Sequence, residues 1–514
     1  MQYAVRGEIV NKALQHVEAL KRGEKRPFKK LTVSTASGSR IEAPPPPPPS
    51  LLWRTDSRRI VATLPKFPSS TLPLQFCNIG NPQELEQRPI SFFRQVLSVT
   101  NWPPLAESGA SSNFPPDVIA RAKRYISAVP GGLGAYSHSQ GLEVVREEVA
   151  AFITRRDGVP AHASDIFLSD GASPAAQAFL KALIRDSRDA VMVPIPQYPL
   201  YSASIALFGG TMVNYYLEEE RGWALDEVEL ERSLADARAS GKNVRCLVVI
   251  NPGNPTGSVL SRDNMRVIID FARRHGLVLI ADEVYQENVW ASGRAFSSFK
   301  KVAAEMGAID VAHSARVRPD GLQLVSLHSI SKGFTGECGR RGGYFELIGF
   351  DEGVRNELYK LASISLCSNT SGQLLLGMQS CPPVEGDPSY PLYAQERDAI
   401  LASLKRRAST LSTALRSLEG VTVEDAEGAL YAFPRIRLPA RAIAAAKAAG
   451  KAPDAFYCLH LLDATGIVLV PGSGFGQRDG TFHFRSTILP PERDLAGVVA
   501  ALASFHSAFM KQFA

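Results

Sequence analysis

Many of the residues of this 514-residue sequence that could do chemistry lie in four short polar motifs. Three of them follow strand-length apolar runs: 251–257 (Asn-Pro-Gly-Asn-Pro-Thr-Gly), 282–285 (Asp-Glu-Val-Tyr) and 329–333 (Ser-Ile-Ser-Lys-Gly). The fourth, 169–174 (Ser-Asp-Gly-Ala-Ser-Pro), precedes an apolar helical pattern and predicts a helix with Ser173 as its N-cap. Each motif alone is common in proteins, but all four together, in the chain order 169–174, 251–257, 282–285 and 329–333, indicate a single site.

Several of these residues could hold a phosphate group. The N-terminus of a helix leaves backbone N–H groups without partners, here at Ala172 and Ser173, and such a terminus attracts anions. The hydroxyls of Ser329 and Ser331 and the guanidinium of Arg341 would complete a cradle for phosphate oxygens.

The remaining polar residues suit an electron-withdrawing pyridine ring. A buried Asp282 could keep a pyridine nitrogen protonated, while Tyr285 and Asn254 could hydrogen-bond an oxygen on the ring. Lys332 would then supply the amine of a Schiff base. Because Arg341 and a cationic ring would lie beside this amine, we expect the pKa of Lys332 to be lowered.

These motifs need a sheet that brings distant parts of the chain together. Apolar runs predict strands at 189–194, 243–250, 277–282 and 322–328. Apolar residues at helical spacing predict a helix over 261–275, with Ser261 as N-cap and Gly276 as its end. A strand, a helix and a strand in this order predict a parallel crossover, and open parallel sheets bind ligands at the carboxyl ends of their strands. We therefore expect an α/β fold with a mostly parallel central sheet flanked by helices.

Composition argues against several other classes of protein. Lys and Arg number 57 against 51 Asp and Glu, and this net charge of +6 is too small for a dedicated nucleic-acid binder. Residues 1–74 hold 13 of the basic and 5 of the acidic side chains, so the rest of the chain is nearly neutral. The six cysteines include no C-x-x-C pair, which disfavours a disulfide scaffold and a structural zinc site. The apolar runs are too short to span a membrane, and the chain does not begin like a signal peptide.

The N-terminal part of the chain has a different texture. Residues 7–22 have the apolar spacing of an amphipathic helix. Residues 32–73 are rich in Ser, Thr and Pro and include six consecutive prolines at 44–49. A proline run can form only polyproline II, so this segment is interpreted as a surface insertion, with a ligand for SH3-type domains as the alternative.

Longer segments of the chain resemble one enzyme family. They are Cys77–Gln83, Gly134–Gly141, Ser169–Ser173, His328–Gly339, Val470–Gly476 and Phe484–Glu492. These segments are similar to those of the fold-type I pyridoxal-phosphate aminotransferases of class I and II, and within them to the alanine aminotransferases. The resemblance covers about residues 3–31 and 75–514, and it implies a smaller α+β domain beside the central sheet.

The resemblance also implies roles for individual residues. Lys332, Asp282 and Tyr285 would be catalytic, with Lys332 carrying the cofactor and shuttling a proton. Pyridoxal 5'-phosphate would be held by Lys332, Ala172, Ser173, Tyr198, Asn254, Asp282, Tyr285, Ser329, Ser331, Arg341 and, across the interface of a homodimer, Tyr136. The substrate would be bound by Arg485, Gly80 and Asn254, with Arg485 taking its α-carboxylate. No metal site is expected.

The implied reaction converts L-alanine and 2-oxoglutarate to pyruvate and L-glutamate by a ping-pong mechanism, in a homodimer that binds neither nucleic acid nor membrane. Glutamate:glyoxylate aminotransferase is one open alternative, and a catalytically silent cofactor-binding regulator is another. A nicotinamide dehydrogenase is disfavoured, since no convincing G-x-G-x-x-G lies between a strand and a helix. The expected compartment is the cytoplasm, with the mitochondrion as the alternative.

The expected domain organisation has five segments. They are an N-terminal helical segment (1–31), a proline-rich insertion (32–74), the first part of a small domain (75–128), a large cofactor-binding domain (129–384) and the second part of the small domain (385–514).

Overall fold

The computed structural model describes residues 74–107, 111 and 113–514, all of which fall within one compact unit. The predicted helix at 7–22 and the proline-rich segment at 32–73 lie outside the described residues. Within the described part of the chain, no helix is long and apolar enough to cross a membrane.

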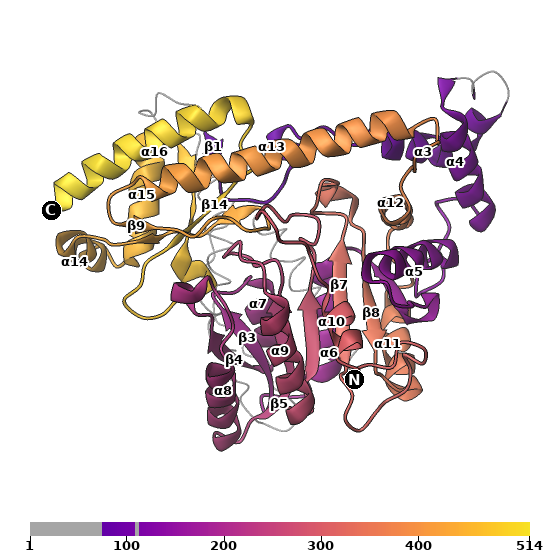
Figure 1. Cartoon of the computed structure of the whole chain (residues 1–514), viewed down its shortest axis with the longest axis horizontal. Helices are drawn as coiled ribbons and strands as arrows, with labels where there is room; N and C mark the ends of the chain where they lie inside the picture. The colour runs from indigo at the N-terminus through magenta and orange to yellow at the C-terminus, as the bar shows by residue number, and fades with distance from the viewer. Residues whose placement is uncertain (1–73, 108–110, 112) are drawn as a thin grey trace, which may run out of the picture. The chain divides into compact units, whose positions relative to one another are not determined.

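A seven-stranded sheet forms the centre of this unit (Figure 1), with its strands in the order β2-β8-β7-β6-β5-β3-β4. Its strands are β2 (Ile166–Ser169), β3 (Asp189–Ile195), β4 (Thr211–Tyr216), β5 (Asn243–Ile250), β6 (Val278–Asp282), β7 (Leu324–Ser329) and β8 (Gly343–Ile348). Neighbouring strands run parallel except at β8, which is antiparallel to both β2 and β7. The expected mostly parallel sheet is therefore confirmed, and the four predicted strands all belong to it.

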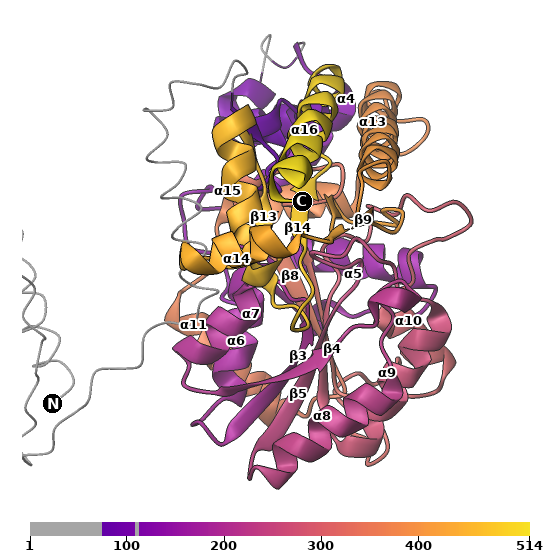
Figure 2. The same ribbon diagram turned by 90° about the vertical axis from the view of Figure 1, so that its left-hand side faces the viewer.

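Helices cover both faces of the sheet, which explains why its central strands are continuously apolar. On one face lie α6 (Ala172–Leu183), α7 (Leu200–Leu207) and α11 (Glu352–Ile364). Figure 2 shows α6 and α7 on one side and, on the other, α8 (Glu227–Ala239), α9 (Arg262–His275) and α10 (Phe299–Glu305). Two further helices, α5 (Glu143–Asp157) and α12 (Thr370–Ser380), pack on each other and contact β2 and β8 respectively.

Helix α9 begins and ends where its sequence predicts. The Ser261 side chain accepts a hydrogen bond from the backbone N–H of Asn264, and Gly276 closes the helix in the left-handed conformation. The apolar stripe of α9, which includes Met265 and Ile269, is buried against the sheet. The crossover from β5 through α9 to β6 is therefore the parallel unit that the sequence predicts.

A second group of elements lies beyond the carboxyl edge of the large sheet. Its helices are α13 (Tyr390–Arg416), α14 (Ala440–Ala448), α15 (Pro453–Thr465) and α16 (Glu492–Phe513). Its short strands are β1 (Gln75–Phe76), β9 (Val421–Thr422), β10 (Tyr431–Ala432), β11 (Arg435–Ile436), β12 (Ile467–Val468), β13 (Val470–Pro471) and β14 (Phe484–Thr487). Strands β10, β14 and β13 form an antiparallel sheet that packs on α13 and α15. Among the described residues, the other α-helices are α3 (Ser91–Asn101) and α4 (Pro116–Ala128), which pack on each other.

Four segments of the chain meet at one edge of the large sheet. Strands β2, β5, β6 and β7 all point the same way, so their carboxyl ends share this edge. Strand β8 begins there, and its Gly343 pairs with both Ser169 and Ser329. All four polar motifs of the sequence therefore come to the same edge.

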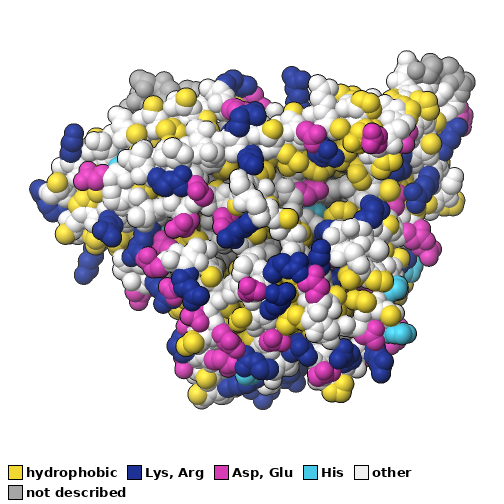
Figure 3. Space-filling model, viewed as in Figure 1, with side chains coloured by type: hydrophobic (Ala, Val, Ile, Leu, Met, Phe, Trp, Pro, Cys, Tyr) yellow, Lys and Arg dark blue, Asp and Glu magenta, His cyan; other side chains and the backbone are white. Residues whose placement is uncertain are grey.

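The face drawn in Figure 3 carries charges of both signs, with a small group of Lys and Arg side chains near its centre. Elsewhere, Lys and Arg side chains alternate with Asp and Glu over both the sheet region and the helices beyond it. This agrees with the near-neutral composition of the chain after residue 74.

Candidate active site

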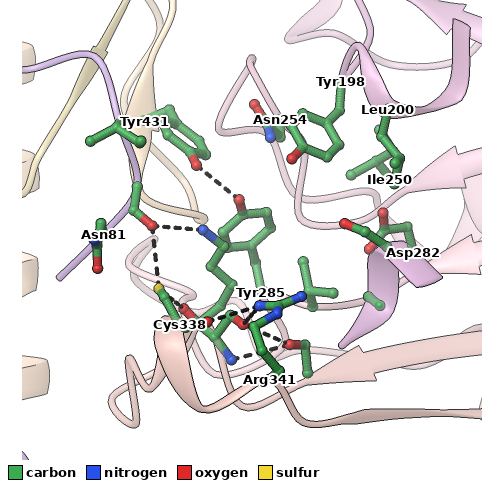
Figure 4. A pocket seen from close by; sticks show the side chains of 18 residues that line it. Asn81, Tyr198, Leu200, Ile250, Asn254, Asp282, Tyr285, Cys338, Arg341 and Tyr431 are labelled. Atoms are coloured by element: carbon green, nitrogen blue, oxygen red, sulfur yellow. Dashed lines mark hydrogen bonds between the residues drawn. The ribbon is translucent and has the colours of Figure 1, made fainter. Parts of the chain in front are cut away.

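The shared sheet edge opens into a cavity of about 250 Å³ (Figure 4). Most of the predicted site residues line it: Gly80, Ala172, Ser173, Tyr198, Asn254, Asp282, Tyr285, Ser329, Ser331, Lys332 and Arg341. The other lining residues are Ile79, Asn81, Leu200, Ile250, Val284, Cys338 and Tyr431. The structure thus brings together residues that are more than 300 positions apart in the chain.

Lys332 follows β7 and carries its amine into the cavity. Its Nζ donates a hydrogen bond to the backbone carbonyl of Gly80 at 2.8 Å and lies 5.7 Å from the centre of the Tyr285 ring. Burial lowers the pKa of Lys332, but Tyr431, Cys338 and Tyr198 act against it, and the net pKa is raised above its ordinary value. The expected lowering is therefore wrong for the protein alone, because the groups around Nζ are phenols and a thiol rather than the cationic ring that the expectation assumed.

Gly80 has to be a glycine for Lys332 to reach its carbonyl. A Cβ at this position would collide with the Tyr431 hydroxyl and would lie 3.0 Å from Nζ of Lys332. Real Cβ atoms essentially never approach another atom as closely as this Cβ would approach the Tyr431 hydroxyl, and the contact with Nζ is tighter than most, so a side chain at residue 80 would displace the ends of these two side chains.

Asp282 ends β6 as a buried carboxylate at the far side of the cavity. Its Oδ2 accepts a hydrogen bond from the Tyr201 hydroxyl at 2.8 Å, whereas its Oδ1 is buried without a partner among the described residues. Burial raises the pKa of Asp282 to about 6, although Tyr201, the backbone N–H of Val284 and the charge of Lys332 all favour the ionised form. A cationic N–H donor in the cavity would satisfy Oδ1 and lower this pKa again.

The end of the cavity near Arg341 is built to bind an anion. The N-terminus of α6 points its first backbone N–H groups, those of Ala172 and Ser173, toward this end. The hydroxyls of Ser329 and Ser331 lie 3.1 Å apart beside them. All four residues belong to the predicted phosphate cradle, and the structure brings them together with the arginine.

The guanidinium of Arg341 is fixed by backbone carbonyls. It donates to the carbonyls of Cys338 and Asp170 at 2.8 and 2.7 Å and reaches the Ser331 hydroxyl at 3.4 Å. Its φ of 52° is uncommon for a residue other than glycine. This backbone conformation and these three contacts hold the positive charge at the anion-binding end.

The predicted start of α6 is wrong in one detail. The N-cap is Gly171 with a φ of 97°, no side chain caps the helix, and Ser173 lies inside the first turn. A Cβ at residue 171 would lie only 2.7 Å from Nη2 of Arg341, so a larger capping residue would push the guanidinium away. The uncapped start leaves the N–H groups of the first turn free for a ligand.

Tyr285 and Asn254 also line the cavity. The Tyr285 hydroxyl donates to that of Tyr431 at 3.0 Å, and burial raises the pKa of Tyr285 well above its ordinary value. The Asn254 Oδ1 accepts a hydrogen bond from Nη1 of Arg485 at 3.0 Å. Asn254 therefore joins the cavity to the arginine behind it.

Arg485 does not itself line the cavity but lies directly behind two residues that do. It projects from β14, and Nη2 donates to the backbone carbonyl of Asn78 at 2.6 Å. The guanidinium lies between the rings of Tyr431 and Phe475, with ring centres at 4.2 and 4.7 Å. Its Nε is buried without a partner among the described residues, so this cation keeps unused hydrogen-bonding capacity.

Two further predicted residues differ sharply in their placement. Tyr198 lines the cavity next to Asn254 (Figure 4). Tyr136 is 77% exposed and is not part of the cavity lining.

Sequence reasoning missed several residues of the site. The main ones are Tyr431, Tyr201, Cys338 and Asn78, which hydrogen-bond or contact predicted site residues. The Cys338 thiol donates to the backbone carbonyl of Ser331 at 3.1 Å. A signal was available for Cys338 and Asn78, since both lie inside the segments that carry the family resemblance. Tyr431 lies in a two-residue strand with no polar motif around it, and Tyr201 lies in the apolar helix α7.

One cavity thus holds the amine of Lys332, the buried carboxylate of Asp282 and the anion-binding end near Arg341. The guanidinium of Arg485 lies behind its wall. The amine can act as a nucleophile or proton carrier, and the guanidinium can bind a carboxylate by a two-pronged hydrogen bond. Such a set suits covalent chemistry on a small substrate that carries a carboxylate.

Comparisons with known proteins show the family to which this chain belongs. Alanine aminotransferase 2 of Panicum miliaceum is 53% identical over 440 residues, 85% of this chain and 89% of that protein. Glutamate–glyoxylate aminotransferase 2 of Arabidopsis thaliana is 50% identical over 440 residues, 85% of this chain and 90% of that protein. Among solved structures, the alanine aminotransferase of Pyrococcus furiosus has a TM-score of 0.67 at 22% identity, covering 89% of this chain and 97% of its own. The family "aminotransferase class I and II" matches residues 105–502, and the chain belongs to that family.

Proposed function

We propose that this chain is a pyridoxal-phosphate-dependent aminotransferase that transfers the amino group of L-alanine to 2-oxoglutarate. The observation that carries the proposal is the meeting of Lys332, Asp282 and the α6 N-terminus around one cavity, with Arg485 behind its wall. The family membership and the relatives named alanine aminotransferase support it.

The residues around the cavity fit this cofactor. Asp282 has a buried, unpartnered Oδ1, which an N–H of the pyridine ring would satisfy. The N-terminus of α6, Ser331 and Arg341 form the anion-binding end of the cavity, which a phosphate group requires. Ser329 and Tyr198 would complete the cofactor site, and Asn254 and Tyr285 would bind the oxygen on the ring. When bound, the cofactor supplies an electron-withdrawing ring that stabilises negative charge at the substrate Cα.

Lys332 is proposed to carry the proton of the reaction. Once its amine is free, Nζ accepts the proton that leaves the substrate Cα and returns it later in the same half-reaction. The Gly80 carbonyl, 2.8 Å from Nζ, holds the ammonium form in place between these two transfers. In the protein alone the pKa of Lys332 is raised, which favours the ammonium form that would hold the proton between the two transfers.

Arg485 is proposed to bind the α-carboxylate that every amino acid and 2-oxo acid substrate shares. Its guanidinium is held by Asn254 and Asn78 and by two aromatic rings, so its plane is fixed before a substrate arrives. A fixed guanidinium orients the substrate Cα–H bond toward Lys332. Because donor and acceptor share this carboxylate, one site can serve both halves of a ping-pong cycle.

Glutamate:glyoxylate transamination is the second candidate, since a relative of that name is 50% identical to this chain. The substrates differ by small groups, whose discrimination is worth only about 1–3 kcal/mol in a binding pocket. Purified protein should therefore be assayed with L-alanine or L-glutamate as donor and with 2-oxoglutarate, pyruvate or glyoxylate as acceptor. The highest kcat/KM is expected for alanine with 2-oxoglutarate. A clear preference for glyoxylate would support the second candidate, and no turnover with any pair would leave the silent-regulator alternative.

A homodimer with shared active sites is part of the proposal. The exposed Tyr136 supports it, because a tyrosine outside its own cavity is available to a neighbouring subunit. Sedimentation should give a dimer, and replacing Tyr136 by Phe should weaken cofactor retention. The five-segment domain organisation and the cytoplasmic compartment stay predictions, which limited proteolysis and cell fractionation would test.

A further inference from the structure

Tyr431 occupies a place in the site that none of the predicted roles uses. It belongs to β10, where it pairs with Thr487 of β14, the strand that carries Arg485. Its side chain is only 3% exposed and lines the cavity (Figure 4). The same small sheet therefore presents both Tyr431 and Arg485 to the cavity region.

The two ends of the Tyr431 side chain touch different parts of the machinery. Its hydroxyl accepts a hydrogen bond from that of Tyr285 at 3.0 Å. A Cβ placed on Gly80 would touch both this hydroxyl and Nζ of Lys332, so the two groups lie close together beside Gly80. Its ring lies 4.2 Å from the guanidinium carbon of Arg485. One side chain thus links the amine that moves the proton to the cation that binds the carboxylate.

Charge connects the Tyr431 hydroxyl to Lys332 as well. Burial raises the pKa of Tyr431, but the positive charges of Lys332 and Arg485 and the hydrogen bond from Tyr285 outweigh it, and the net pKa is lowered. In return, Tyr431 is the largest influence that raises the pKa of Lys332. The other titratable or charged groups that face this pair are Tyr198, Asp282, Cys338 and Arg341.

We propose that Tyr431 is a positioning residue with two separable actions: its hydroxyl keeps the proton on Nζ of Lys332, and its ring fixes the plane of the Arg485 guanidinium. This inference rests on the proposed function of the site, in which Lys332 moves the proton and Arg485 binds the carboxylate. The inference adds one residue, Tyr431, whose hydroxyl acts on Lys332 and whose ring acts on Arg485.

Two substitutions separate these actions. Tyr431→Phe keeps the ring and removes the hydroxyl. Tyr285 then loses its hydrogen-bond acceptor and Lys332 loses a neighbouring polar group, so kcat should fall about tenfold while KM changes little. Tyr431→Leu also removes the ring, so the KM for alanine and for 2-oxoglutarate should rise about tenfold as well, because the cation–π contact is lost. A general loss of packing would not lower kcat alone in Tyr431→Phe and raise KM only in Tyr431→Leu.

A spectroscopic readout tests the hydroxyl without relying on turnover. In the holoenzyme, the pH midpoint at which the absorption of the lysine-bound cofactor changes should fall in Tyr431→Phe, because the lysine nitrogen loses the neighbouring hydroxyl that favours its protonated form. Tyr457→Phe is the matched control, since it removes another buried hydroxyl, one that contacts His506 outside the cavity. That variant should keep the wild-type midpoint and kcat.

The outcomes separate this inference from the proposed function. An unchanged pH midpoint and kcat in Tyr431→Phe would overturn the inference. The same fall in kcat and the same rise in KM in Tyr431→Phe and Tyr431→Leu would overturn it as well. Failure of the wild-type protein to transaminate any substrate pair would instead overturn the proposed function.

Discussion

Replacing Arg485 by Lys isolates the geometry of the carboxylate site from its charge. The guanidinium now donates to Asn254 at 3.0 Å and to the Asn78 carbonyl at 2.6 Å, and it is stacked between Tyr431 and Phe475. A lysine ammonium keeps the positive charge but has no planar fork. It can bind a carboxylate at one point only, and it has no planar group to stack between the two aromatic rings.

The expected loss follows from these contacts. A hydrogen bond to a charged group contributes about 1.5–3 kcal/mol, and Arg485→Lys removes one of the two that a carboxylate would receive. At about 1.4 kcal/mol for each factor of ten, kcat/KM should fall roughly 10- to 150-fold. Because the α-carboxylate is common to all substrates, the loss should be similar for L-alanine and for 2-oxoglutarate.

The assay is steady-state transamination with each substrate varied in turn. Arg406→Lys is the matched control, since Arg406 lies on α13, is 60% exposed and pairs with Glu492 outside the cavity. It should keep wild-type kcat/KM for both substrates. If Arg485→Lys also keeps it, or if only one of the two substrates is affected, the assignment of the shared carboxylate to Arg485 is refuted.

Two further predictions follow from the same contacts. Gly80→Ala should lower kcat by about tenfold with little loss of stability, because the new methyl group would displace the Tyr431 hydroxyl and Nζ of Lys332. Gly497→Ala is the control and should not change kcat, because a methyl group at residue 497 would touch no other atom. Equal activity of the two alanine variants would contradict the close approach at Gly80. Burial raises the pKa of Glu287 from 4.5 to about 7, so between these pH values the folded protein holds a proton that the unfolded chain has released, and stability should fall as the pH rises. Glu287→Gln should remove part of this fall when unfolding is followed with urea, and an unchanged pH dependence would argue against the raised pKa.

The sheet and most of the cavity could be predicted from the sequence because their signals are local. The strand that ends at Asp282 is a continuous apolar run, and the helix after β5 has its own cap at Ser261 and its own stop at Gly276. Once the parallel order is assumed, the polar residues after each strand must share one edge. Ser329, Lys332 and Asn254 were therefore predictable as neighbours.

The parts that were missed depend on contacts between distant segments. Tyr431 reaches the cavity only because two-residue β10 pairs with β14, and nothing around it in the sequence marks a site. Tyr201 supports Asp282 from a helix 81 positions earlier in the chain. The raised pKa of Lys332 depends on Tyr431 and Tyr198, so its direction could not be read from the Ser-x-Ser-Lys motif alone.

The start of α6 shows a different kind of limit. The motif around Ser173 has the composition of a side-chain-capped helix, yet the cap is Gly171 with no side-chain contact. The reason is Arg341, whose guanidinium needs the space beside residue 171. A local preference was overridden by a residue 170 positions away that belongs to the site.

The most direct test of the account is to find which lysine carries the cofactor. The holoenzyme should be reduced with borohydride, which fixes the cofactor to its lysine, and then digested and analysed by mass spectrometry. The account predicts the added mass on the peptide that contains Lys332, with no such label and nearly no transaminase activity in Lys332→Ala. A label on another lysine, or full activity of Lys332→Ala, would contradict it.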